Sequence, residues 1–139
     1  MNPPTSIRLS QQAKDQLTRL KSVTGIEQWN ILCRFGFLLS LAENAAPTTA
    51  SLPFDSNVEM TWKVFCGDHE YTIWAILVSA GRKHGVNTDP GISHLLRSHI
   101  HRGIAHLLAT QMKNLARISA VMLATERRSE SPLVQQRLV

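Results

Sequence analysis

The start of the chain changes from an alternating pattern of apolar and polar residues to a helical one. Ile7 and Leu9 would lie on one side of an extended segment, with Arg8 on the other. Further on, apolar residues recur at helical spacing, at Ala13, Leu17 and Leu20. Ser10 is a suitable N-cap and Gly25 a suitable end for such a helix. The sequence therefore predicts a short strand that leads directly into an amphipathic helix.

The following segment is apolar around almost its whole circumference. A second helix is predicted from Ile26 to Glu43, and its later half carries Ile31, Leu32, Phe35, Phe37, Leu38, Leu39 and Leu41. A helix that is apolar on all sides needs neighbours on all sides, so we expect the protein to form oligomers. Gly36 lies inside this helix, where glycine costs stability unless a second backbone packs closely against it. Gly36 therefore supports the same expectation of oligomers.

The middle of the chain predicts a loop, a strand and a third helix. Two prolines and the absence of periodicity predict a loop over residues 44–58. The segment from Glu59 to Cys66 then alternates and predicts a second short strand, one face of which carries Met60, Trp62 and Val64. A third helix follows Asp68, its expected cap, with apolar residues at Tyr71, Trp74, Leu77, Val78 and Gly81.

The last part of the sequence predicts two further helices. Asp89 and Pro90 form a typical helix start, with the aspartate as cap and the proline at the first helical position. The fourth helix packs through apolar residues from Ile92 to Leu108, and its expected solvent face carries His94, Arg97, Ser98, His101 and Arg102. A fifth helix is predicted over residues 113–127, and residues 129–139 are expected to be a disordered tail. The sequence thus predicts one small, mainly α domain over residues 1–128.

Composition and charge indicate the kind of partner. A chain of 139 residues, 43% of them hydrophobic, can bury one core, which leaves no room for a separate catalytic module. The formal net charge of +5 favours an acidic partner such as nucleic acid or an anionic membrane surface. Because no bilayer-spanning segment or secretory signal is recognised, we expect no membrane association. The two distant cysteines, Cys33 and Cys66, indicate a reduced, cytoplasmic setting rather than a disulfide framework.

The basic residues lie mostly towards the two ends of the chain. Residues 1–44 carry five basic and three acidic side chains, residues 45–91 three and five, and residues 92–139 seven and two. The candidates for contacts with backbone phosphates are Arg8, Lys14, Arg19, Lys21, Lys63, Arg82, Lys83, Arg97 and Arg102. The basic stripe on the first helix, which includes Lys14 and Lys21, is also typical of a solvated helix face. The cations between Gly81 and Gly85 are also typical of side chains that complement the negative end of a helix.

No pattern in the sequence indicates an enzyme, a metal site or a cofactor. His94, His99, His101 and His106 lack the spacing of three or four residues by which one helix presents two ligands to a metal ion. His69 follows Cys66 closely, but no orienting acid or anion hole accompanies them, as nucleophilic catalysis requires.

Four segments carry a resemblance to a known family. They are residues 6–21 (SIRLSQQAKDQLTRLK), 24–35 (TGIEQWNILCRF), 59–67 (EMTWKVFCG) and 98–104 (SHIHRGI). In order, over about residues 5–109, they resemble the DndE family of the bacterial DNA phosphorothioation system. The resemblance implies a helical protein with a ribbon-helix-helix-like beginning that assembles as a tetramer. It also implies binding of double-stranded DNA, preferably nicked, through lysines near flexible loops, for which suitable positions are Lys14, Lys21, Lys63 and Lys83.

One position departs from the ribbon-helix-helix pattern. Glu27 stands two residues after Gly25, where such proteins usually place a small polar residue at a helix N-terminus that anchors a phosphate. Its carboxylate would repel phosphate, and Arg8 is the only strong base-reading side chain on the first strand.

From these observations we expect a non-catalytic subunit that has no cofactor and binds the phosphate backbone of DNA. By resemblance it works beside a cysteine desulfurase and other proteins of the sulphur modification complex. Two alternatives stay open. One is a scaffold that docks through the apolar second helix, and the other is a sulphur-transfer accessory protein that acts through Cys66 or Cys33.

Overall fold

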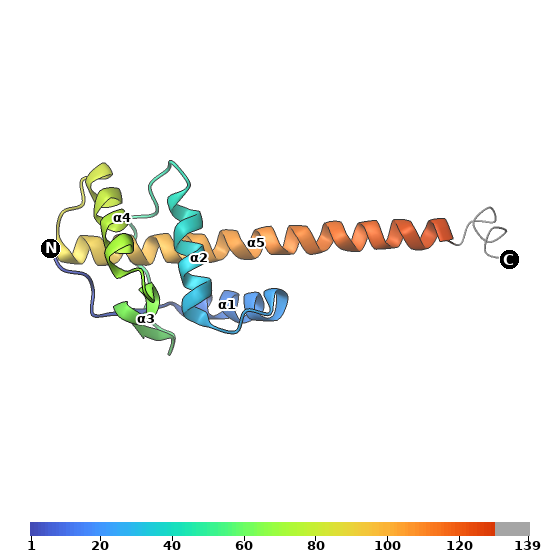
Figure 1. Ribbon diagram of the computed structural model, residues 1–139, viewed down its shortest axis with the longest axis horizontal. Coiled ribbons are helices and arrows are strands. Elements are labelled where there is room, and N and C mark those ends of the chain that lie inside the picture. The colour runs from blue at the N-terminus through green and yellow to red at the C-terminus, as the bar shows by residue number, and fades with distance from the viewer. Residues whose placement is uncertain (130–139) are drawn as a thin grey trace. The chain divides into compact units, whose positions relative to one another are not determined.

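The computed structural model describes residues 1–129, which form five helices and one two-stranded sheet (Figure 1). The elements in chain order are β1 (Ser6–Arg8), α1 (Gln11–Thr24), α2 (Trp29–Leu41), β2 (Glu59–Thr61), α3 (Trp62–Cys66), α4 (Glu70–Lys83) and α5 (Asp89–Ser129). The prediction of a mainly α fold with two short strands is confirmed. The chain divides into two compact units, residues 1–108 and the segment from Ala109 onward. The predicted tail lies outside the described residues except for Ser129, the last residue of α5.

The two short strands tie the N-terminus to the middle of the chain. β1 pairs with β2 in antiparallel fashion, and Ile7 lies opposite Met60. Both of these side chains are buried, while their neighbours in each strand are exposed. Ser10 caps α1 by accepting a hydrogen bond from the amide of Ala13, and Gly25 ends the helix at a φ of 74°. The ribbon-helix-helix-like start stays a prediction, because β1 pairs here with a strand of its own chain.

The predicted second strand is wrong beyond Thr61. The hydroxyl of Thr61 accepts a hydrogen bond from the amide of Val64 at 3.1 Å, which caps α3 and turns the chain into a helix at Trp62. Trp62 is 9% exposed and Val64 is 49% exposed, so the two do not share a face as strand alternation had predicted. A capping threonine thus ended the strand pattern.

Two predicted helix starts are also wrong in detail. α4 begins after His69 without a side-chain cap, so Asp68 does not cap it, and Tyr71 is 91% exposed rather than packed. At the start of α5 the hydroxyl of Thr88 accepts a hydrogen bond from the amide of Gly91, so this threonine, and not Asp89, is the cap. The two helices predicted after Asp89 form one continuous helix.

α2 lies across α5, and the two backbones touch at a pair of glycines (Figure 1). A Cβ atom on Gly103 would lie 1.6 Å from the carbonyl oxygen of Gly36, so no side chain fits between the helices at this point. The close backbone packing at Gly36 thus lies within one chain, and the self-association inferred from this glycine stays a prediction. Around the crossing lies the core of the first unit, with Leu17, Leu20, Leu32, Phe37, Phe65, Leu77, Ile100 and Ile104 among its buried residues.

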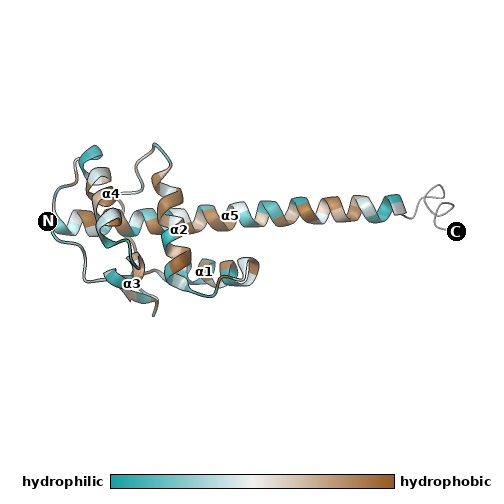
Figure 2. Cartoon of the chain, in the orientation of Figure 1, coloured by the Kyte–Doolittle hydropathy of each residue, from teal (hydrophilic) through white to brown (hydrophobic). Residues whose placement is uncertain are grey.

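One expected solvent face is wrong, and one apolar face is left open. On α5, Arg97 and Ser98 are 7% and 1% exposed, although they belong to the predicted solvent face. On α2, Phe35, Leu38 and Leu39 remain 48%, 44% and 38% exposed, as a helix apolar on all sides leads one to expect (Figure 2). No helix among residues 1–129 combines the length and the apolar character needed to cross a membrane.

Candidate nucleic-acid interface

The basic side of α1 lies at the surface of the first unit. Ala13, Leu17 and Leu20 anchor the helix in the core, which turns Lys14 and Lys21, seven residues apart, to one flank. The ammonium group of Lys14 donates a hydrogen bond to the side-chain oxygen of Asn57 at 2.6 Å. The ammonium group of Lys21 lies 5.1 Å from the ring centroid of Trp29, a cation–π contact. Arg19 is exposed on the other flank of the helix.

A groove of about 560 Å³ opens beside this flank. Its walls come from α1, the first turn of α2, α3 and the residues leading into β2. The lining residues are Lys14, Trp29, Asn30, Asn57, Val58, Glu59, Met60 and Val64. The groove thus combines an apolar floor with amide, ammonium and carboxylate groups, so its charge is mixed rather than uniformly positive.

Arg8 reaches the groove only as the partner of a carboxylate. Its guanidinium group lies 2.8 Å from the Glu59 carboxylate, which also accepts a hydrogen bond from the hydroxyl of Ser6. The hydrogen bond from Arg8, then that from Ser6, and the positive charge of Arg8 lower the pKa of Glu59. The base-reading role considered for Arg8 therefore requires that it leave this ion pair.

Lys63, Arg82 and Lys83 are exposed at other places of the same unit. The ammonium group of Lys63 is 3.9 Å from the carboxylate of Glu70, and the Lys63 side chain is 81% exposed. Arg82 and Lys83 lie in the last turn of α4, where Gly85 turns the chain at a φ of 72°. Their position suits both a phosphate contact and the neutralisation of the helix C-terminus, so neither interpretation is excluded.

Arg97 is used inside the first unit. Its guanidinium group donates hydrogen bonds to the carbonyl oxygens of Arg8 at 3.0 Å and Pro53 at 2.8 Å. It also lies 3.8 Å from the ring centroid of Phe54. Burial lowers the pKa of Arg97 below its usual value. These contacts hold the loop between α2 and β2 against α5, and they occupy the donors that a phosphate would need.

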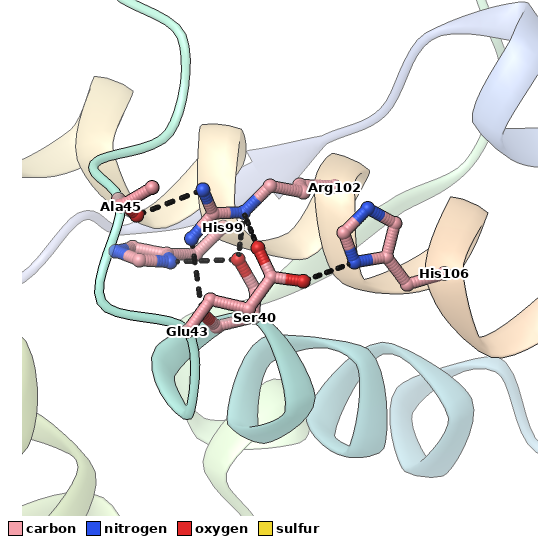
Figure 3. Close-up of polar contacts among 6 residues, drawn as sticks. All are labelled: Ser40, Glu43, Ala45, His99, Arg102 and His106. Atoms are coloured by element: carbon pink, nitrogen blue, oxygen red, sulfur yellow. Dashed lines mark hydrogen bonds and ion pairs between the residues drawn. The ribbon is translucent and has the colours of Figure 1, made fainter.

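Arg102 closes the C-terminal end of α2 in a similar way (Figure 3). It donates to the hydroxyl and the carbonyl oxygen of Ser40 at 2.7 and 2.9 Å and to the carbonyl oxygen of Ala45 at 2.9 Å. The carboxylate of Glu43 lies 3.4 Å from Arg102 and 2.5 Å from Nδ1 of His106. Since the last carbonyl groups of a helix have no partner within it, Arg102 supplies a charged C-cap from another helix.

His99 completes this network as a neutral ring. Its Nδ1 atom lies 2.9 Å from the hydroxyl oxygen of Ser40, which already accepts a hydrogen bond from Arg102. The hydroxyl proton is then free to be donated to Nδ1, which places the ring proton on Nε2. Burial, with the charges of Arg102 and His84 as smaller causes, lowers the pKa of His99 to about 4. Nε2 is buried and has no hydrogen-bond partner within residues 1–129.

Both cysteines lie in the packed interior. Burial raises the pKa of Cys33 to about 12, and it is also the main cause that raises the pKa of Cys66 to about 12. Both thiols are therefore protonated at neutral pH, whereas a nucleophile or metal ligand must be a thiolate. Within the described part of the chain, no three His, Cys, Asp or Glu side chains come together in a way that could hold a metal ion.

The structure thus divides the sequence-predicted cations into two groups. Lys14 and Lys21 flank one groove, Arg8 is paired beside it, and Arg19, Lys63, Arg82 and Lys83 are exposed elsewhere on the first unit. Arg97 and Arg102 hold backbone carbonyl groups. The sequence analysis did not identify Trp29, Asn30 and Asn57 as groove residues. Of these, only Trp29 could have been noticed in the sequence, as an aromatic residue eight positions after Lys21.

Comparisons with known proteins agree with this architecture. Residues 6–115 match the family described as DNA sulphur modification protein DndE. The crystal structure of DndE from Escherichia coli, described as involved in DNA phosphorothioation modification, is similar with a TM-score of 0.67 at 24% identity, covering 77% of this chain and 99% of that one. A DndE variant with two glycine-to-lysine substitutions has a TM-score of 0.60 at 18% identity, covering 76% and 99%. No curated protein sequence matches the chain.

Proposed function

Since the chain belongs to the DndE family of DNA sulphur modification proteins, we propose that it takes part in DNA phosphorothioation as a non-catalytic, DNA-binding subunit. It binds double-stranded DNA, preferably nicked, through backbone phosphates. The contacts come from surface cations of the first unit. The half-buried Lys14 and Lys21 are the principal pair, and the exposed Arg19, Lys63, Arg82 and Lys83 support them.

One observation carries this proposal: on one flank of α1, Lys14 lines a groove and Lys21 lies over the ring of Trp29, which also lines it. Lysine is a mobile point charge that suits phosphate contacts without selecting a base. Carboxylates of Asp15 and Glu59 lie nearby and weaken the local positive potential, so we expect moderate affinity and little sequence preference.

The non-catalytic part of the proposal is supported by the state of the thiols. Sulphur transfer through a cysteine needs a thiolate that a donor can reach. Cys33 and Cys66 are buried, and their pKa values are raised to about 12. This favours DNA binding over the sulphur-transfer alternative.

The protein is further proposed to work as a homotetramer beside other proteins of the modification complex, in the cytoplasm. The exposed apolar side chains of Phe35, Leu38 and Leu39 on α2 support assembly. The same face supports the second candidate function, a scaffold whose main task is to hold partner proteins. Light scattering on the purified chain gives the number of copies directly.

DNA binding is tested by fluorescence anisotropy with a labelled duplex of one sequence in nicked, intact and single-stranded form, at several salt concentrations. We expect the logarithm of the binding constant to fall linearly with the logarithm of the salt concentration. The nicked duplex should bind best. Equal binding of nicked and intact duplex would remove the preference for nicks, and salt-insensitive or absent binding to every form would contradict the whole proposal.

The double variant Lys14→Gln, Lys21→Gln assigns the interface. If each lysine neutralises one phosphate, the salt slope becomes shallower by about 1.8, since each contact contributes about 0.9. The matched control is Lys113→Gln, Arg117→Gln, which removes two cations from the second unit. Equal losses in both variants would indicate a general effect of net charge. Unchanged binding in the first variant would favour the scaffold.

A further inference from the structure

The second unit exposes apolar side chains along one helix. Between Ala109 and Ser129, the exposed fraction is 38% for Met112, 41% for Leu115, 55% for Ile118 and 60% for Met122. The buried core of the first unit includes no residue of the described chain beyond Leu108. Such a row of exposed apolar residues is unusual on a protein surface and indicates a site that another molecule covers.

These four residues, which we call the C-terminal stripe, share one side of α5. They are separated by three, three and four residues, the spacing that places side chains on one helix face. At 100° per residue, Lys113, Arg117 and Arg128 lie on the opposite side. Figure 2 shows apolar and hydrophilic residues side by side along this part of α5. The basic side also carries Val121, which is 65% exposed, so the helix is amphipathic only in part, with its apolar residues concentrated in the stripe.

Half of the stripe lies beyond the part of the chain that matches the family model. The family match ends at residue 115. The Escherichia coli structure, matched over 99% of its own length, accounts for 77% of this chain. Ile118 and Met122 thus belong to an addition to the shared fold, and the packing of that fold does not explain them.

We propose that the C-terminal stripe pairs with the same stripe of a second copy of this chain. An isolated helix of about 20 residues is only marginally stable in water unless its apolar face is packed. A second copy is a partner that is present wherever the chain is. This pairing is independent of the proposed DNA binding.

The placement of charge favours a second copy over other occupants. Lys113, Arg117 and Arg128 point away from the stripe, so two stripes meet without bringing these cations together, and an antiparallel pair also keeps the two Glu126 carboxylates apart. An acidic groove on a foreign protein would instead be met by cations at the edges of the stripe. Glu126, four residues after Met122, sets a carboxylate on the side of the stripe, which disfavours an anionic lipid surface.

The first test compares two triple variants of the full chain by sedimentation velocity over a dilution series without DNA. The stripe variant is Leu115→Glu, Ile118→Glu, Met122→Glu. The matched control, Ala116→Glu, Ala120→Glu, Ala124→Glu, adds the same charge away from the stripe. We expect the concentration of half-dissociation to rise by about tenfold or more in the stripe variant, and by less than about twofold in the control. Equal behaviour of both variants and the parent chain overturns the proposal.

The second test keeps the helix intact and maps the contact directly. Ile118 lies near the middle of the described segment, so in a centred pair it meets its counterpart whether the two helices run parallel or antiparallel. The native cysteines are buried, so Ile118→Cys should give a covalent dimer on mild oxidation, while Ala124→Cys on the outer side should not. Equal crosslinking at both positions overturns the proposal. A second result also overturns the proposal: the parent chain binds phosphatidylserine vesicles, the stripe variant does not, and the two proteins have the same mass in solution.

Discussion

The lysines of α1 and the arginines of α5 carry the same charge but serve opposite purposes. Lys14 and Lys21 lie on a flank of the first unit. Lys14 donates a hydrogen bond to the neutral side chain of Asn57, and Lys21 makes a cation–π contact with Trp29. Arg97, which is buried, and Arg102, which is half-buried, donate to backbone carbonyl groups. The difference teaches that a polar helix face is not necessarily a solvent face. Loops and helix ends offer unpaired carbonyl groups, and arginine has enough donors to satisfy several at once.

The largest expected effect is that of Arg102→Met. This change removes every hydrogen bond from the guanidinium to Ser40 and Ala45 and leaves the amide of Glu43 as the donor to the carbonyl oxygen of Ser40. We expect the free energy of unfolding to fall by about 3 kcal/mol, measured by urea denaturation. Arg102→Lys should recover only part of the loss, because one ammonium group cannot reproduce the fork of donors. A loss below about 1 kcal/mol would mean that Arg102 contributes no more to the free energy of unfolding than an exposed cation does.

Next in size is the dependence of stability on pH. The pKa of His99 is about 4 in the folded protein and about 6.5 when exposed, so the unfolded chain binds the proton more readily. The stability from keeping this ring neutral is complete above pH 6.5 and is lost as the pH falls from about 6.5 through 4. Between pH 7 and pH 5 the loss is about 2 kcal/mol. Burial lowers the pKa of His101 as well and acts in the same direction.

Urea denaturation at a series of pH values checks this expectation. The variant His99→Gln should flatten the dependence in this window, whereas His69→Gln, which replaces an exposed histidine, should keep it. A dependence that survives unchanged in His99→Gln would mean that other groups cause it.

A smaller effect is expected when the surface lysines are changed. The variant Lys14→Gln, Lys21→Gln should alter the free energy of unfolding by less than about 0.5 kcal/mol, because exposed cations contribute little to stability. Its affinity for duplex DNA should nevertheless fall by about tenfold or more at low salt. Denaturation and anisotropy on the same preparation separate the two quantities. A loss of stability comparable to that of Arg102→Met would erase the contrast between the two regions.

The smallest effect concerns the ion pair between Arg8 and Glu59 beside the groove. Both side chains are more than 40% exposed, so a double-mutant cycle with Arg8→Ala and Glu59→Ala should give a coupling below about 1 kcal/mol. In the DNA assay the single change Glu59→Gln should strengthen binding, since it removes a carboxylate from the groove. Weaker binding of Glu59→Gln would show that the ion pair itself is needed.

The parts of the fold that follow from local pattern could be predicted from the sequence. The strand at Ile7, the cap at Ser10 and the end of α1 at Gly25 each depend on residues close in the chain. The close helix contact at Gly36 could be inferred because an interior glycine needs a reason to be there. In contrast, α3 replaced most of the second strand, because a single hydroxyl at Thr61 outweighed the alternating pattern that follows it.

The candidate site was harder to predict, because it depends on which distant groups meet. The basic flank of α1 could be found from spacing alone. The burial of Arg97 and Arg102 could not, since their carbonyl partners lie in the loop between α2 and β2 and at the end of α2, segments without periodicity. Asn57 is a groove residue for the same reason, because a loop residue carries no signal of the surface it will face.

The contact between Gly36 and Gly103 fixes the register of α2 along α5. If either helix slid by one position, a neighbour with a side chain, such as Arg102 or Ile104, would enter a space that holds only backbone. The crossing therefore allows only one alignment of the two helices. This alignment places the guanidinium of Arg102 at the C-terminal end of α2. Two glycines without side chains thus determine which carbonyl groups a charged side chain, one residue away, can reach.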